Sequence, residues 1–528
     1  QAKYQRKSIS YVDYVWLAGG GERISRLEQN LLLDAIRREI EMPRFDFNAL
    51  PEPILRNFNR DLTSRSISDL DGLAAAISDA LVPEILQILD YEKEMRAAGL
   101  VGETDRASFV VEKAKELGIT AEDLEAIMNS AYIYMPVLSS VSVDKNEEKD
   151  HVSVTLVGGI IWFSVKADSN GGVVELLARK ISRGIGFASL KKRYDHNGAK
   201  LDGVQYAFAS AARTLALNLR VASQEIPDFQ LTNPLTATGA GWVRFSMGRQ
   251  EGVGMDDKFV IAEYYEQPDG SVKQRKLGLV RAAQVNQSDC RARSVIGRGY
   301  ERGMLAVEHP RLPIDVSLRF FTTEFKVDSG AYNNEFVISE ESVGSLYTGQ
   351  LWLNYNTAEV TNLSQFFLSL YGEIGYGEIH HATAFDAKIP GGLYLGGGIG
   401  LVKKYYLNRF HLGLEALGSL AYYTLSGTKE TDATEWKWQL ASMGLTCNAN
   451  LEIALGYDFN LGAGVSYRLF APQADWKYTD DGEEKDLSDI QGLPEVNFSG
   501  WGYQIYFTWS LPALSIDPVG AVRGTAGL

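Results

Sequence analysis

The sequence predicts an α+β protein, in which an N-terminal α/β domain and a small β-rich module precede an eight-stranded antiparallel β-barrel. Three observations lead to this fold class. Apolar and polar residues alternate through eight segments of the last third, helical stripes and strands mix before residue 235, and glycine-marked turns separate short apolar runs between these regions. The predicted boundaries are 1–235, 236–312, 313–512 and a tail at 513–528.

The last segment alternates most clearly. From Trp501 to Leu511 the odd positions are apolar, and the even positions are small or polar. Because strand side chains point to two opposite faces, one face is apolar and the other polar. An apolar outside with charge inside is typical of a barrel in a membrane, since a soluble sandwich has a dry interior. A soluble β domain is the alternative.

The eight candidate strands span 315–327, 345–357, 363–377, 391–404, 408–424, 435–455, 459–470 and 500–512. The first has no clean parity. The sixth changes its apolar face between Trp436 and Leu455, so we expect a bulge or break near 442–450. Long and short connections alternate along the segment, as outer-membrane barrels alternate outside loops with periplasmic turns. An even strand count leaves the tail in the periplasm.

The strand parity assigns side chains to the two faces of this barrel. The residues expected to face the lumen, in a structural role, are Glu373, Glu415, Arg468, Gln504 and Tyr506. The residues expected to face lipid are Leu412, Val465, Tyr467, Ile505 and Phe507. Eight strands leave room only for side chains, so we expect Arg468 to pair with Glu373 or Glu415 and fill the interior. A catalytic lumenal carboxylate, as in membrane-barrel hydrolases, is the alternative.

The region before residue 235 mixes both element types. A strand at 8–18 precedes a helix that begins with the capping box Ser25/Glu28 and ends near Ile40. After a short strand at 44–48, the remaining expected elements are helices at 68–98, 104–117 and 120–129, a hairpin at 131–167 with an exposed edge, and an amphipathic helix at 204–224.

This plan resembles the periplasmic domain of the curli secretion channel family. The segments that carry the resemblance are Ser8–Trp16, Leu33–Ile40 with Arg44–Phe47, Lys113–Ile119 with Ala131–Leu138, and Val152–Val165. The resemblance implies a periplasmic domain that packs against neighbouring copies. Family members carry a lipidated N-terminal Cys and form one shared barrel from hairpins inserted in the domain. Here the chain starts at Gln1 and the predicted barrel follows the domain.

The middle module is predicted from strands that start at Met255, return through Leu277–Val285 and close near Gly299–Val307, with a turn at Pro268–Gly270. The segment "GVGMDDKF…DG…GLVRAAQV" resembles the C-terminal module of flagellar assembly protein T. The resemblance implies a structural role, and a simple spacer domain is the alternative.

Composition excludes some classes of protein. The net charge of −15 argues against nucleic-acid binding. The sequence contains no run of about 18 apolar residues, so it predicts no membrane-spanning helix. A start at Gln1 suggests a mature chain from which a signal peptide has been removed. Cys290 and Cys447 fall in different predicted domains, so we expect neither a disulfide nor a metal site on them.

The sequence holds no recognisable catalytic motif, and we predict no enzyme, catalytic residue, cofactor or metal. His380 and His381 are expected to be a solvated loop pair. The acidic loop 471–499 could hold Ca²⁺, although a charged surface loop is the simpler interpretation.

Together these features favour a protein of the bacterial outer membrane with a large periplasmic part. We expect the barrel to anchor a periplasmic scaffold for a secretion or surface-appendage machine. The alternatives are an oligomeric channel or transporter and a barrel-borne hydrolase. The expected partners are outer-membrane lipid, other periplasmic or outer-membrane proteins, and further copies of the chain.

Overall fold

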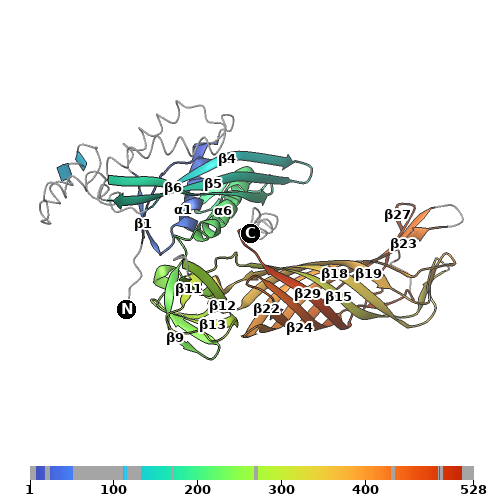
Figure 1. Ribbon diagram of the computed structural model, residues 1–528. Helices are drawn as coiled ribbons and strands as arrows, with labels where there is room; N and C mark the ends of the chain where they lie inside the picture. The colour runs from blue at the N-terminus through green and yellow to red at the C-terminus, as the bar shows by residue number, and fades with distance from the viewer. Residues whose placement is uncertain are drawn as a thin grey trace. The chain divides into compact units, whose positions relative to one another are not determined.

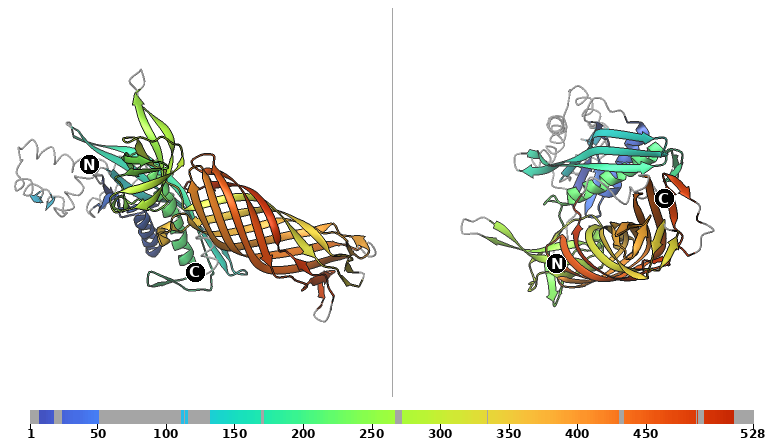
Figure 2. Two further views of the ribbon diagram at one scale, coloured as in Figure 1. Left: turned by 90° about the horizontal axis from the view of Figure 1, so that it is seen from below. Right: turned by 90° about the vertical axis from the view of Figure 1, so that its right-hand side faces the viewer.

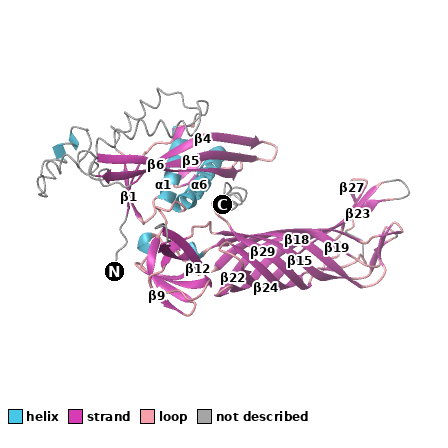
Figure 3. Ribbon diagram, in the orientation of Figure 1, coloured by secondary structure: helices cyan, strands magenta, loops and turns pink. Residues whose placement is uncertain are grey.

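The computed structural model describes residues 7–17, 24–50, 111–112, 114–115, 132–168, 171–266, 272–333, 335–429, 434–485, 487 and 492–513. These residues are mostly β-strand, with few helices (Figure 3). No described helix is both long enough and apolar enough to cross a membrane. The predicted helices at 68–98, 104–117 and 120–129 fall wholly or largely outside the described residues, as does the tail after residue 513. Two compact units are present, divided mainly at Leu231.

The first unit contains a mixed sheet with the strand order β3-β1-β4-β5-β6, and β2 lies beside β4. Its strands are β1 (Lys7–Tyr11), β2 (Trp16–Leu17), β3 (Phe45–Ala49), β4 (Tyr132–Asn146), β5 (His151–Asp168) and β6 (Gly171–Ala188). The strands β1, β3 and β4 run parallel, and β4, β5 and β6 are antiparallel. A parallel pair requires a crossover connection, which α1 (Arg26–Ile40) supplies between β1 and β3.

Helices α1 and α6 (Gly203–Gln224) contact each other beside the sheet (Figure 1). The predicted capping box of α1 is confirmed: the Glu28 amide donates to Ser25 Oγ at 3.2 Å, and the Ser25 amide donates to the Glu28 carboxylate at 2.7 Å. The apolar stripes of both helices join the inner face of the sheet in one core, which includes Ile36, Trp162 and Leu215.

The hairpin expected at 131–167 has no open edge along β5, because β6 pairs with β5 from Val152 to Asp168. On the other side, β1 and β2 pair with β4 only as far as Leu138, so among the described strands the predicted exposed edge is limited to 139–146 of β4. The basic residues of β6 hide its strand character in the sequence. Two glycines of β6 let α6 approach closely: a Cβ on Gly184 would collide with the Ala211 carbonyl oxygen, and one on Gly186 would collide with that of Ala207.

The second unit begins with a small closed barrel, ordered β10-β13-β12-β11-β14-β9. Its strands are β9 (Thr232–Gly239), β10 (Trp242–Phe245), β11 (Lys258–Glu266), β12 (Val272–Val285), β13 (Cys290–Ile296) and β14 (Leu305–Glu308). The closing strand is shorter than predicted because Gly297, Gly299 and Gly303 all have positive φ angles and form a loop.

Eight long strands form the large barrel of this unit (Figures 1 and 2). They are β15 (Ile314–Val327), β18 (Ser342–Asn356), β19 (Phe366–Glu378), β22 (Gly391–Leu407), β23 (Phe410–Thr428), β24 (Glu435–Ala454), β25 (Phe459–Phe470) and β29 (Gly500–Ser510). Each is antiparallel to its neighbours, and the pairing of β15 with β29 closes the ring. We call the end with connections 357–365, 408–409 and 455–458 the turn end, and the opposite end the loop end.

The bulge predicted near 442–450 is absent, and that prediction is wrong. β24 pairs with β23 in unbroken register from Glu435 to Ile453. The even positions of β24 point inward throughout: Trp436 and Trp438 are buried near the loop end, as is Glu452 near the turn end. The inner face therefore changes from aromatic to polar along one regular strand. The same change explains the unclear parity of β15, where Arg319 and Phe325 are both buried.

Aromatic side chains fill the loop end. The strands there are β16 (Gly330–Tyr332), β17 (Phe336–Ile338), β20 (Ala382–Ala384), β21 (Ala387–Lys388), β26 (Lys477–Asp480), β27 (Glu483–Lys485) and β28 (Val496–Asn497). Four of them form a separate sheet, β16-β17-β20-β21. Phe336, Trp438 and Trp476 pack together with Tyr478 in a buried cluster. The long connections therefore close this end of the barrel with an apolar core.

Candidate functional site

The outer face of the large barrel is apolar. All five residues predicted to face lipid are exposed: Leu412 41%, Val465 42%, Tyr467 41%, Ile505 62% and Phe507 41%. Their inward neighbours are small or polar and are buried, as Ser466 (1%) and Gln504 (3%) show. Exposed apolar side chains on one continuous face of a closed barrel need a nonaqueous surrounding.

Three ion pairs cross the interior of the large barrel, and we call these the lumenal pairs. Nearest the turn end, Lys404 Nζ lies 2.9 Å from Glu452 Oε1, and the Tyr506 hydroxyl donates to the same oxygen at 3.0 Å. The His411 ring lies beside them, with Nδ1 3.6 Å from Glu452 Oε2. The Lys404 and Glu452 side chains are only 4% and 2% exposed.

The second pair joins Arg319 to Glu415. Both terminal guanidinium nitrogens donate to the carboxylate at 2.9 Å, the two-point geometry that makes such pairs strong. Asn448 Nδ2 donates to Glu415 Oε2 at 2.6 Å, and Arg319 also donates to the side-chain oxygen Oε1 of Gln504 at 3.3 Å. This pair lies between the other two along the strands.

The third pair joins Arg468 to Glu373, with a nitrogen–oxygen distance of 2.7 Å. The same carboxylate accepts from Gln350 Nε2 at 2.8 Å and from the hydroxyls of Thr348 and Tyr394, each at 3.1 Å. The sequence left Arg468 with two possible partners, and the structure pairs it with Glu373.

Aromatic rings connect the three lumenal pairs into one column. Arg319 stacks between Trp352 (3.6 Å) and Tyr506 (4.5 Å), and Tyr506 donates to Glu452. The Trp352 indole donates to Gln350 at 2.8 Å, and Gln350 donates in turn to Glu373. The interior is thus filled along its length, and each of these carboxylates has a cationic partner.

All five residues predicted for the lumen lie in this column: Glu373, Glu415, Arg468, Gln504 and Tyr506. Sequence reasoning missed Arg319, Lys404 and Glu452. Arg319 lies on the strand whose parity was unclear, and Glu452 lies on the strand for which a bulge was expected. Reading Glu452 and Trp436 as one inward row would have revealed that carboxylate.

The small barrel contacts the turn end through two aspartates. Asp256 accepts hydrogen bonds from the Asn356 side chain at 3.0 Å, the Ser364 hydroxyl at 2.6 Å and the backbone N–H of Gln365 at 2.5 Å. Asp256 holds a positive φ of 71° to make these contacts. A carboxylate that accepts three such bonds fixes the small barrel to the connection between β18 and β19.

The second aspartate, Asp458, lies in the turn between β24 and β25. Arg311 donates two hydrogen bonds to it, at 2.9 and 2.7 Å, and His309 Nε2 lies 3.0 Å away. Burial raises the pKa of Asp458, but the hydrogen bonds from His309 and Arg311 outweigh it and hold the pKa below the usual range. Lys258 Nζ lies 3.9 Å from the same carboxylate, and burial lowers the pKa of Lys258 to about 7.

The other candidate residues lie apart from these contacts. His380 and His381 are exposed at the loop end, and Cys290 and Cys447 are free. Within the described part of the chain, no group of three or more His, Cys, Asp or Glu residues is placed to hold a metal ion. The acidic loop is described only in part, so the calcium hypothesis stays a prediction.

No protein-family model and no curated protein matches this chain. Solved structures that are similar include the outer membrane protein OprG from Pseudomonas aeruginosa (12% identity, 38% of this chain and 96% of that chain, TM-score 0.24). Ail, the attachment invasion locus protein of Yersinia pestis, is 8% identical, and the match covers 38% of this chain and 98% of Ail with a TM-score of 0.21. The outer membrane protease OmpT from Escherichia coli is 10% identical, and the match covers 54% of this chain and 97% of OmpT with a TM-score of 0.22.

Proposed function

We propose that this chain is an outer-membrane protein whose large barrel is a closed anchor for the periplasmic parts that precede it in the sequence. The observation that carries the proposal is the column of lumenal pairs inside an apolar outer face. A barrel of eight strands has an interior just wide enough for side chains, and here ion pairs and aromatic rings occupy it. A filled interior suits an anchor better than a channel.

The contacts at the turn end support the same role. Asp256 and Asp458 bind the small barrel to the short connections, which in outer-membrane barrels lie on the periplasmic side. The small barrel is therefore held rigidly against the turn end of the large barrel. The resemblance of the N-terminal unit to the curli secretion channel domain supports a scaffold role in a secretion or surface-appendage machine. We assign Glu373, Glu415 and Glu452 structural roles rather than catalytic ones.

Conductance measurements test the anchor proposal. Purified full-length protein inserted in planar bilayers should show no steady current. A stable channel in the wild-type protein would contradict the proposal and favour transport. As a comparison, Arg468→Ala combined with Glu373→Ala removes one lumenal pair. This variant should also show no steady current, because the other two pairs and the apolar core of the loop end remain in place.

The scaffold role needs a separate measurement. Crosslinking in intact cells, followed by affinity purification of the full-length protein, should recover crosslinks on the N-terminal unit rather than on the loop end. Crosslinks confined to the loop end would reject the periplasmic scaffold and leave the anchor proposal standing.

A further inference from the structure

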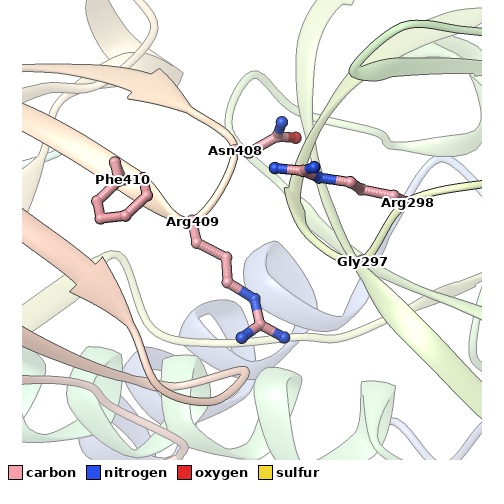
Figure 4. A pocket seen from close by; sticks show the side chains of 5 residues that line it. All are labelled: Gly297, Arg298, Asn408, Arg409 and Phe410. Carbon is pink, nitrogen blue, oxygen red and sulfur yellow. The ribbon is translucent and has the colours of Figure 1, made fainter.

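Two adjoining clefts lie where the small barrel meets the turn between β22 and β23. The first has a volume of about 330 Å³ and is lined by Gly297, Arg298, Asn408, Arg409 and Phe410 (Figure 4). The second has a volume of about 490 Å³ and is lined by Ala240, Gly241, Trp242, Ala283, Gln284, Arg291, Arg293, Ser294, Tyr406, Leu407 and Asn408. Asn408, at a positive φ of 58°, belongs to both clefts.

The charge of these clefts is opposite to that of the chain. Four arginines line them, and no Asp or Glu does so among the described residues, although the chain carries a net charge of −15. Arg293, Arg298 and Arg409 are exposed, and in the described part of the chain no carboxylate forms an ion pair with them. Arg291 stacks on the Trp242 ring at 4.4 Å. Arginine in this setting is a ready partner for a phosphate group.

The clefts adjoin the outer face of the large barrel. Leu407 ends β22 and Phe410 begins β23, and these side chains are 72% and 49% exposed. Leu407 points outward like Tyr405 on β22, and Phe410 points outward like Leu412 on β23. The apolar outer face therefore extends to the edge of the clefts. In Figure 4, Arg298 extends toward Asn408, whereas Phe410 leaves the turn in a different direction. A ligand here would meet cationic groups on one side and apolar groups on the other.

The contacts around the clefts fix their walls. Arg281 stacks on Tyr406 at 5.1 Å, and Val260, Leu279 and Ile296 of the small barrel pack with Ala454 of the large one. The clefts are therefore preformed features of one compact unit rather than gaps between loosely tethered parts.

We infer that these clefts bind the headgroup of an anionic glycerophospholipid from the adjacent membrane leaflet. The phosphate lies among Arg298, Arg409 and the arginines of β13, and the acyl chains lie along Leu407 and Phe410. A free phosphate ion would use the arginines but would leave the apolar edge uncovered. This inference rests on the proposed membrane position of the large barrel, and it adds a lipid specificity that the anchor role does not require.

Native mass spectrometry of the full-length protein in detergent tests this site. The probes are phosphatidylglycerol and phosphatidylcholine with identical acyl chains. The wild type should retain phosphatidylglycerol with a preference on the order of tenfold. Arg298→Gln with Arg409→Gln should lose this preference. The matched control, Arg275→Gln with Lys276→Gln, removes the same charge from exposed positions of β12 outside both clefts and should keep it.

Equal retention of the two lipids by the wild type, or equal preference in the two double variants, would overturn the inference. Inorganic phosphate at millimolar concentration should not displace the lipid, and full displacement would reassign the clefts to a small anion. Insertion into vesicles is measured on the same samples. Normal insertion without lipid preference rejects only this inference, whereas failure to insert rejects the anchor proposal as well.

Discussion

Arg311 and Asp458 form a two-point ion pair between the segment that leaves the small barrel and the turn between β24 and β25. Their side chains are 16% and 18% exposed, so water screens the pair only in part. Together with Asp256, this contact makes the small barrel a fixed extension of the large one. The short segment between β14 and β15 therefore has a fixed conformation at this contact.

The assignment of the outer face predicts the effect of a charge placed there. Val465→Arg should prevent assembly into the outer membrane, because an arginine near the middle of the lipid face costs roughly 2–4 kcal/mol. Leu412→Arg should act in the same way. The measurement is the folded fraction in purified outer membranes, with Val465→Leu as the tolerated control. Normal assembly of both arginine variants would show that this face does not lie in lipid.

The lumenal pairs predict strong coupling between their members. Arg468→Met should lower the free energy of unfolding by about 3–5 kcal/mol, because it leaves the buried Glu373 carboxylate without its cation. Adding Glu373→Gln should recover much of this loss. Urea unfolding in lipid vesicles of the two single variants and the double variant measures the coupling. Strictly additive effects would mean that the two residues do not stabilise each other.

Lys258 predicts a pH dependence at the turn end. Burial, helped by the charges of Arg281 and Arg311, lowers the pKa of Lys258 from 10.5 to about 7 against the opposing charges of Asp315 and Asp458. Between about pH 7 and pH 10.5, Lys258 is protonated in the unfolded chain but not in the folded protein. The free energy of unfolding should therefore rise with pH over this range. Chemical denaturation at fixed ionic strength measures this slope. Lys258→Met should flatten it and should stabilise the protein below pH 7, and an unchanged slope would exclude Lys258 as the cause.

The contact between β6 and α6 predicts a steric effect. Gly184→Ala would drive a Cβ into the Ala211 carbonyl oxygen and place it 2.7 Å from the Leu215 amide nitrogen. The helix must shift, at a cost of about 1–3 kcal/mol. Hydrogen exchange of the α6 amides in the full-length protein should accelerate. Arg183→Ala, at an exposed neighbouring position, serves as the control, and equal exchange in both variants would argue against tight packing here.

The alternation of apolar and polar residues by itself determined much of the large barrel. All eight strand positions inferred from it lie within a few residues of those observed, and α1 begins at the capping box that the sequence contains. The physical reason is local: a strand with different surroundings on its two faces must alternate, and a helix start needs its own cap. The strand β6 was missed because apolar and basic residues mix on its outward face, as Ile181 and Arg183 do, and its inward face includes Gly184 and Gly186.

Only the tertiary structure decided which charges meet. Arg319 and Glu415 are 96 positions apart in the sequence, and their pairing depends on the register of every strand between them around the ring. The aromatic inner face at the loop end is also a tertiary property, because the interior there is the core of the folded connections rather than a polar lumen. Alternation shows that Trp436 and Glu452 lie on the same face of β24. It does not show that this face contacts an aromatic core at the loop end and a buried ion pair near the turn end. The arginine clefts likewise exist only because the small barrel packs against the turn at Asn408.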